Sequence, residues 1–153
     1  AHWREHSIEV MLPFLLALQP ELSVVPICLK HLSLDRCIAL GEAIARVAAR
    51  AAEPIGVVAS SDMTHYEPDA TARERDRHAI DAALTLDPAN LYDTVHNQGI
   101  TMCGVVPATT AMVAANSMGA ARAHLVAYAT SGDSSGDRSS VVGYAGICFG
   151  RDH

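Results

Sequence analysis

Short apolar runs that alternate with long helical patterns constrain the fold of this sequence more than any other feature. Residues 22–29 and 55–59 form continuous apolar runs typical of buried strands, although Pro26 would place the first near a sheet edge. Between them, residues 33–52 form an Ala-rich helical pattern that begins with Ser33, a residue suited to cap a helix. This alternation predicts an α/β fold with a mostly parallel or mixed sheet flanked by helices.

Further helices are indicated by apolar periodicity and by residues that start or stop helices. An apolar stripe follows Ser7 and contains Pro13, so this helix should start late or be kinked. Asp69 and Asp87 are the expected caps of two later helices, and Gly119 suits the end of the last one. The helices predicted in this way are residues 7–18, 69–84, 87–97 and 107–117.

The length of 153 residues suffices for one domain, which we expect to span residues 1–153. Two strand-like runs, 124–129 and 140–149, close it and can pair antiparallel around a polar loop. Apolar residues make up 50% of the chain and charged residues 18%, and the mean hydropathy is +0.16. These values indicate either a large core or a surface that contacts a partner.

Charge and cysteine spacing exclude several classes of protein. The net charge is −6 and the arginines form no clustered basic face, so we expect no nucleic-acid partner. Residues 73–77 alternate arginine with acidic residues, which is typical of a solvated helix face. The apolar stretch Val10–Leu18 is far shorter than the roughly 20 residues of a membrane span, so we expect no membrane association. The four cysteines form no CxxC pair, which predicts reduced thiols and a cytoplasmic location.

The segment 60–66 is the first candidate site, because ligands of open α/β sheets bind beyond the carboxyl ends of strands and this segment follows the run 55–59. Within it, His65 follows Asp62 by three residues, so the carboxylate can orient the imidazole for proton transfer. The alternative is a simple Asx turn at Asp62 with His65 as an ordinary loop residue.

Three further places carry reactive side chains. Cys103 lies in the glycine-flanked segment 99–104 and is either a metal ligand or nucleophile, or a small buried apolar residue. His6 precedes the first helix, where it has either a role in a site or ordinary solvation. The loop 132–138 is either an anion-binding rim that includes Arg138 or a hydrophilic connection.

Several segments together resemble the Memo-like family, whose bacterial members are called AmmeMemoRadiSam system protein B. They occur in the family's order and span nearly the whole chain, which makes the resemblance specific. The matching segments are EHSIEVMLPF (5–14), VVPI (24–27), VVASSDMTHY (57–66), CG (103–104) with Pro107, YATSGD (128–133) and GDRSSVVGYA (136–145).

This family is similar to the LigB-type, or class III, extradiol dioxygenases, in which two histidines and a carboxylate hold a non-haem iron and another histidine acts as acid/base. In Memo-like proteins a cysteine replaces the carboxylate. The resemblance therefore implies a LigB/Memo-like fold with Cys103 as a metal ligand, His65 with Asp62 as the acid/base pair, and His6 on the substrate side of the same pocket. Iron or copper would be the metal of the complete protein.

The resemblance also implies that this chain is the C-terminal portion of a Memo-like domain, with the half that carries two further histidine ligands absent. We therefore expect little or no tightly bound metal in this chain, and an exposed apolar surface that binds a protein or peptide partner or a second copy. Two functions remain open. One is a metal-dependent, dioxygenase-like oxidoreductase or oxygen-activating protein, and the other is a non-catalytic peptide- or partner-binding protein with a vestigial pocket.

Overall fold

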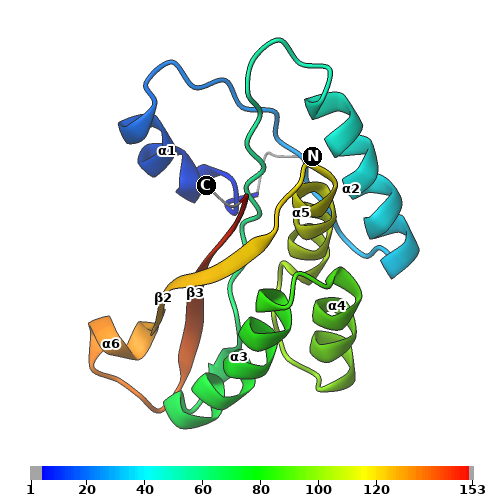
Figure 1. The fold of residues 1–153 in the computed structure, drawn as a ribbon. Helices are drawn as coiled ribbons and strands as arrows, with labels where there is room; N and C mark the ends of the chain where they lie inside the picture. Colours follow the sequence, from blue (N-terminus) through cyan, green and yellow to red (C-terminus); the bar gives the residue numbers. More distant parts are fainter. Residues whose placement is uncertain (1–4, 152–153) are drawn as a thin grey trace.

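The computed structural model describes residues 5–151 and confirms an α/β fold (Figure 1). In chain order, its elements are η1 (Glu9–Met11), α1 (Leu12–Leu18), α2 (Leu34–Ala48), β1 (His65–Glu67), α3 (Asp69–Leu84), α4 (Pro88–Asn97), α5 (Val105–Ser117), β2 (Arg122–Thr130), α6 (Ser131–Ser135) and β3 (Val141–Gly150).

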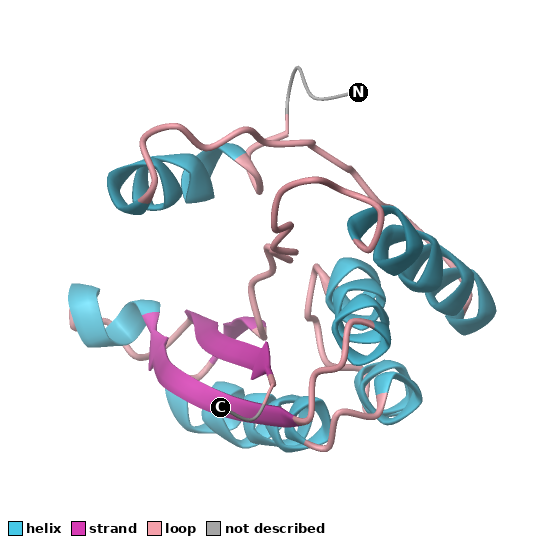
Figure 2. Ribbon diagram, turned by 45° about the horizontal axis from the view of Figure 1, so that its top comes forward, coloured by secondary structure: helices cyan, strands magenta, loops and turns pink. Residues whose placement is uncertain are grey.

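The sheet has three strands in the order β1-β3-β2, and β3 pairs antiparallel with both neighbours. The long β2–β3 pairing runs from Arg122 opposite Gly150 to Thr130 opposite Gly143, which confirms the predicted pairing of the last two runs. In Figure 2, α3 lies along one side of the sheet, and α1 with the loop that follows it lies on the other. Helices α2, α4 and α5 form a separate layer at one end of the sheet.

The predictions of strands at 22–29 and 55–59 are wrong for the structure of this chain. Within residues 5–151 both segments are irregular, and neither belongs to a strand ladder (Figure 1). Their apolar and β-branched residues favour extended backbone, but a strand also needs a neighbour to accept and donate its backbone hydrogen bonds. These runs lack that neighbour in the described chain.

Large apolar side chains on these two segments and on α1 are exposed, which confirms the expected exposed apolar surface. Phe14 and Leu18 on α1 are 70% and 85% exposed, and no residue of this helix is buried. On the irregular segments, Val25 is 84% exposed and Val58 is 57% exposed. Such a concentration exceeds the single apolar residues that normally face solvent.

Helix boundaries follow the predicted signals at most positions. Pro13 lies in the first turn of α1, so this helix starts late, as expected. Asp87 caps α4 by accepting hydrogen bonds from two backbone amides, and Gly119 has a φ of +90° just after α5. Ser7, which precedes the apolar stripe, does not cap α1, and the expected cap at Asp69 is wrong. The Ser7 amide instead donates to Glu5 Oε1, and Asp69 is the first residue inside α3.

The core lies between α3, α4, α5 and one side of the sheet, where Ile80, Leu91 and Met112 are almost fully buried. Helix α2 joins this core by packing closely on α5 at Gly41. A Cβ atom at Gly41 would lie 2.6 Å from the carbonyl oxygen of Thr110, so only glycine permits this approach.

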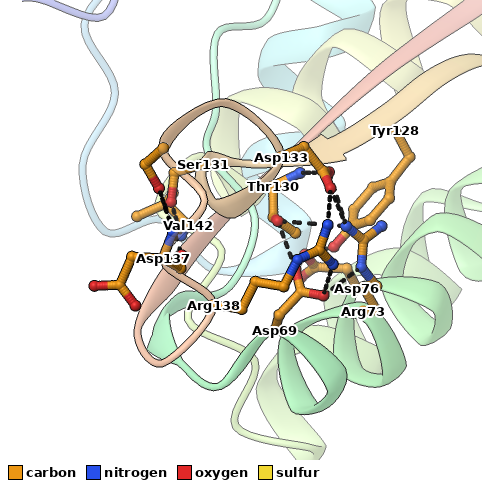
Figure 3. Close-up of polar contacts among 11 residues, drawn as sticks. Asp69, Arg73, Asp76, Tyr128, Thr130, Ser131, Asp133, Asp137, Arg138 and Val142 are labelled. Atoms are coloured by element: carbon orange, nitrogen blue, oxygen red, sulfur yellow. Dashed lines mark hydrogen bonds and ion pairs between the residues drawn. The ribbon is translucent and has the colours of Figure 1, made fainter.

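The interpretation of residues 73–77 as a solvated helix face is wrong at Arg73. Its guanidinium donates to Asp69 at 2.9 Å and to Asp133 at 2.7 Å, and both carboxylates also bind Arg138 (Figure 3). Thr130 completes this cluster by donating to Asp69 at 2.6 Å. The cluster connects the start of α3 to α6 and to the loop after it. Charge alternation in the sequence does not show that Arg73 also binds Asp133, a residue 60 positions away.

Asp76, on the same helix, is completely buried and joins three parts of the fold. Its carboxylate accepts hydrogen bonds from the Thr64 amide at 2.8 Å and from the Tyr128 hydroxyl at 2.7 Å. Burial, and then the hydrogen bond to Asp76, raises the pKa of Tyr128. Gly143 of β3 lies against this carboxylate, and a side chain at position 143 would overlap it. Asp76 thus holds the loop before β1 to the sheet.

The Asp69 cluster makes the fold sensitive to acid. Hydrogen bonding from Arg73 is the main cause that lowers the pKa of Asp69 to about 2. Because this folded pKa lies below the unfolded value, the stabilisation is complete above about pH 4 and is lost as the pH falls towards about 2. We expect Arg73→Met to reduce this loss, as measured by urea unfolding at several pH values. Arg50→Met, which removes an exposed charge elsewhere, should leave it unchanged. An equal loss in wild type and Arg73→Met would contradict this assignment.

The packing of Asp76 against β3 predicts that alanine destabilises the fold at one glycine of this strand and is tolerated at another. Gly143→Ala should lower the free energy of unfolding by about 1–3 kcal/mol, because the new Cβ displaces the buried carboxylate. At Gly146 the nearest atom to a new Cβ is Val126 Cβ at 3.8 Å, an ordinary contact. Gly146→Ala is therefore the control, with an expected change below about 1 kcal/mol in urea unfolding. Equal effects of the two substitutions would refute this packing.

Candidate metal centre

Three potential metal ligands meet where the segment before β1 approaches the loop before α5. One ligand atom each from Asp62, His65 and Cys103 lies within 4.8 Å of the other two. Asp62 and His65 are partly buried, and Cys103 is exposed. The structure therefore brings Cys103 of the segment 99–104 together with Asp62 and His65 of the segment 60–66, and the three residues offer one sulfur, one oxygen and one nitrogen donor.

Thr101 fixes the orientation of His65 from two sides. The backbone amide of His65 donates to Thr101 Oγ1 at 2.8 Å, and the ring Nδ1 lies 2.8 Å from the Thr101 carbonyl oxygen. Because a carbonyl oxygen only accepts, Nδ1 must carry the hydrogen. The neutral ring then presents the lone pair of Nε2, and this atom lies 3.5 Å from Asp62 Oδ2. Two electron-pair donors that face each other in this way are suited to share a proton or a cation.

Cys103 is held beside this pair by backbone contacts. The Asp62 amide donates to Cys103 Sγ at 3.2 Å, and this sulfur lies 3.9 Å from the Asp62 carbonyl oxygen, to which the thiol can donate. The next residue, Gly104, donates its amide to Ser61 Oγ at 2.9 Å and leaves no room for a Cβ atom. This confirms that a glycine in the segment 99–104 permits close approach of another backbone. Cys103 also lies just before α5, where the helix amides favour negative charge.

Two tyrosines flank the centre, and no pattern in the sequence indicates either of them. Tyr66 has a φ of +60°, which is unusual for an aromatic residue, and its ring lies 5.8 Å from the His65 ring. On β3, burial and then the charge of Asp62 raise the pKa of Tyr144. Thr101 was also missed, since a backbone carbonyl that orients a histidine leaves no pattern in the sequence. The left-handed backbone at Tyr66 likewise has no glycine or asparagine to signal it.

His6 and Arg138 are not in this centre. The His6 side chain is 79% exposed, and its Nδ1 lies 3.1 Å from Glu9 Oε2. Arg138 binds Asp69 and Asp133, so its guanidinium is already engaged by two carboxylates. The loop 132–138 therefore serves as a structured connection that includes α6, rather than as an anion-binding rim built on Arg138.

The structure also bears on the state of the cysteines and on membrane-spanning helices. All four cysteines are free thiols. Among the described residues, no helix combines the length and the apolar character needed to cross a membrane.

Comparisons with known proteins identify relatives over nearly the whole chain. The family profile of Memo-like proteins matches residues 1–148. A MEMO1 family protein of Methanopyrus kandleri is 45% identical over 152 residues, which cover 99% of this chain and 54% of that protein. One from Methanocaldococcus jannaschii is 44% identical over 149 residues, covering 95% of this chain and 52% of that protein. One from Archaeoglobus fulgidus is 42% identical, covering 97% of this chain and 56% of that protein.

The chain spans about half the length of these curated relatives. The match nevertheless includes every segment on which the resemblance was based, and it contains Asp62, His65 and Cys103. The extent of the profile match and the identities above 40% lead to one conclusion: this chain belongs to the family of Memo-like proteins.

Proposed function

We propose that this protein is a metal-dependent redox or oxygen-activating protein, in which Cys103 is a metal ligand and His65, assisted by Asp62, transfers a proton. The observation that supports this most strongly is the convergence of the three side chains within 4.8 Å, with Nε2 of His65 directed at the Asp62 carboxylate. An exposed thiol beside an oriented imidazole and a carboxylate is an unusual arrangement for a purely structural loop.

The residues of the centre fit a transition metal in type but not in number, because His65 and Asp62 are assigned to proton transfer and Cys103 alone remains as a ligand. Imidazole and thiolate suit iron, copper and zinc, and a carboxylate completes a mixed set. Stable sites take three or four protein ligands, and a ligand set as open to solvent as this one holds its metal weakly. A bound non-haem iron or copper would supply redox chemistry and open positions for oxygen or a phenol-like substrate.

The protein's own residues have separable tasks in this proposal. Cys103 contributes a soft, negatively charged ligand. His65 moves a proton at Nε2, because Thr101 keeps the hydrogen on Nδ1. Asp62, 3.5 Å away, stabilises the ring when Nε2 becomes protonated. The sulfur donor distinguishes this centre from the ligands of ring-cleaving dioxygenases, so its reaction need not be ring cleavage.

A second function, binding of a protein partner, is favoured by the exposed apolar surface on α1 and the two irregular segments. We propose that its occupant is a polypeptide equivalent to the part of the relatives that this chain does not span. The length of that part, about half of each relative, is sufficient to cover such a surface. The unpaired runs 22–29 and 55–59 would then gain strand neighbours. Such a partner would also supply further ligands to the metal centre.

Cobalt titration of the chain tests the ligand assignment. We expect weak binding of Co²⁺ with sulfur-to-cobalt charge-transfer absorption, which Cys103→Ser abolishes because it removes the sulfur donor. Cys148→Ser, which removes another exposed thiol, is the matched control and should leave this absorption unchanged. His65→Gln should leave this absorption in place and change the affinity by less than about threefold, because the proposal assigns Nε2 of His65 to proton transfer and not to the metal.

Two results of this titration would refute the proposal. One is charge-transfer absorption that persists in Cys103→Ser, and the other is affinity that falls about tenfold or more in His65→Gln, because His65 would then be a ligand and not the proton carrier. Iron or copper held tightly at one ion per chain through purification would refute the claim that the ligand set is incomplete.

Complementation tests the role of the partner polypeptide. The part of the Methanopyrus kandleri relative outside the matched region, co-expressed with this chain, should form a complex and raise metal affinity by about tenfold or more, since added ligands complete the coordination. With the metal-loaded complex, oxygen consumption in the presence of catechols should depend on His65. As a control, His6→Ala should not change complex formation, because the exposed His6 ring is held by a local contact with Glu9.

The outcomes of complementation separate the two functions. A complex without a gain in metal affinity supports partner binding and contradicts the metal centre. A complex that binds metal but shows no turnover, or turnover unchanged by His65→Ala, contradicts the proposed oxygen chemistry. Self-association of the chain in place of a complex would assign the apolar surface to a second copy.

A further inference from the structure

A cavity of about 680 Å³ adjoins the candidate metal centre. It lies between the loop 29–33 before α2, one side of α4, and the segment 99–106 that leads into α5. Cys103 forms part of its wall, so a molecule in this cavity would lie beside the proposed metal ligand. Its size is within the range of about 300–1,000 Å³ typical of small-molecule sites.

Apart from the Cys103 thiol and the Tyr92 phenol, the titratable side chains of the cavity are basic, in a chain whose net charge is −6. Lys30, the only lysine in the sequence, lines it together with His31 and His96, and no carboxylate is among its described lining residues. Ser33 also lines it and is the N-cap of α2, so the positive end of a 15-residue helix begins at its edge. Asp35 lies in the first turn of that helix but does not line the cavity.

The remaining lining is largely apolar and includes a stacked ring pair. The rings of Tyr92 and His96 on α4 are 4.1 Å apart between centroids, with 27° between their planes. The Tyr92 hydroxyl donates to the Leu32 carbonyl at 2.9 Å and so fixes one wall to the other. His96 Nδ1 lies 2.7 Å from the Tyr92 carbonyl oxygen and must donate to it, which leaves Nε2 as the free ring nitrogen.

We propose that this cavity binds a small organic anion with an apolar body, held by Lys30 through its charge and by the aromatic and aliphatic walls through contact. The combination of a single ammonium group with apolar walls favours one anionic group on a ring or short chain. Recognition of this ligand needs only the described residues. Its identification as the substrate class rests on the proposed function, because Cys103 connects the cavity to the metal centre.

A carboxylate and a phosphate monoester share this chemistry, so the test uses both. The probes are 2-naphthoate and 2-naphthyl phosphate, with 2-naphthamide as the neutral analogue and inorganic phosphate as an anion without an apolar body. Binding to the metal-free chain is measured by calorimetry. Because Lys30 is the only lysine, reductive ¹³C-methylation also places one side-chain NMR signal in the cavity while keeping its charge.

We expect at least one naphthyl anion to bind, to shift the Lys30 methyl signal, and to bind about fivefold or more tightly than the amide or inorganic phosphate. Lys30→Met should remove most of this preference. Arg50→Met is the matched control, because it removes an exposed cation after α2 that does not line the cavity, and it should leave binding unchanged.

Equal binding of the amide and the anions, binding unaffected by Lys30→Met, or no binding of either anion would overturn the inference. A tighter complex with the phosphate would assign the anionic group as a phosphate monoester, and a tighter complex with naphthoate as a carboxylate. The parallel cobalt titration keeps the two proposals separate. Anion binding without metal binding refutes only the metal centre, and metal binding without anion binding refutes only this inference.

Discussion

The structure depends on the hydrogen bonds of one buried carboxylate, Asp76 of α3. Burying a carboxylate is costly unless its oxygens are satisfied, and here each oxygen accepts from a different part of the fold. One bond reaches the Thr64 amide in the segment before β1, and the other reaches the Tyr128 hydroxyl on β2. Gly143 of β3 leaves space for this carboxylate. Its carbonyl oxygen accepts from the Met63 amide and its amide donates to the Thr64 carbonyl oxygen, each at 2.9 Å. A helix, both long strands and the loop that bears the candidate site are thus joined at one point.

The same contacts position the candidate metal centre. Thr64, which Asp76 holds, is the residue before His65, and Thr101 holds His65 itself. On the other side, Ser61 binds the Gly104 amide, so the loop with Cys103 is attached to the segment with Asp62. The three proposed functional side chains therefore extend from backbone that is held by neighbours not expected to take part in the reaction. These contacts position the side chains of the centre although the run 55–59 does not form a strand.

The sequence predicted the features that depend on local signals. It did not predict strand pairing and side-chain contacts that depend on residues far along the chain. The Asp87 cap, the late start of α1 at Pro13 and the glycine after α5 are set by contacts within a few residues, and all were predicted correctly. The runs 22–29 and 55–59 have strand propensity, but pairing depends on a neighbour that the sequence pattern does not contain. Arg73 and Asp76 looked like solvated residues because their partners lie far along the chain. For the site, the resemblance and the residue types indicated Asp62, His65 and Cys103. Thr101 orients the His65 ring through a backbone carbonyl that any residue could supply, and its hydroxyl binds the His65 amide from 36 residues away.

The metal centre and the anion cavity share Cys103, and this has an energetic consequence. A carboxylate, a thiol sulfur that accepts a hydrogen bond, and an imidazole lone pair lie together at the centre, which concentrates electron-pair donors and favours a cation. A cation bound there would attract an anion in the adjoining cavity, since opposite charges in a partly buried environment are screened less than in water. Linkage then requires that the anion strengthen cation binding by the same factor. If both proposals hold, the basic residues of the cavity and the donor atoms of the centre are electrostatically complementary, because Lys30 and a bound cation would both attract the anion.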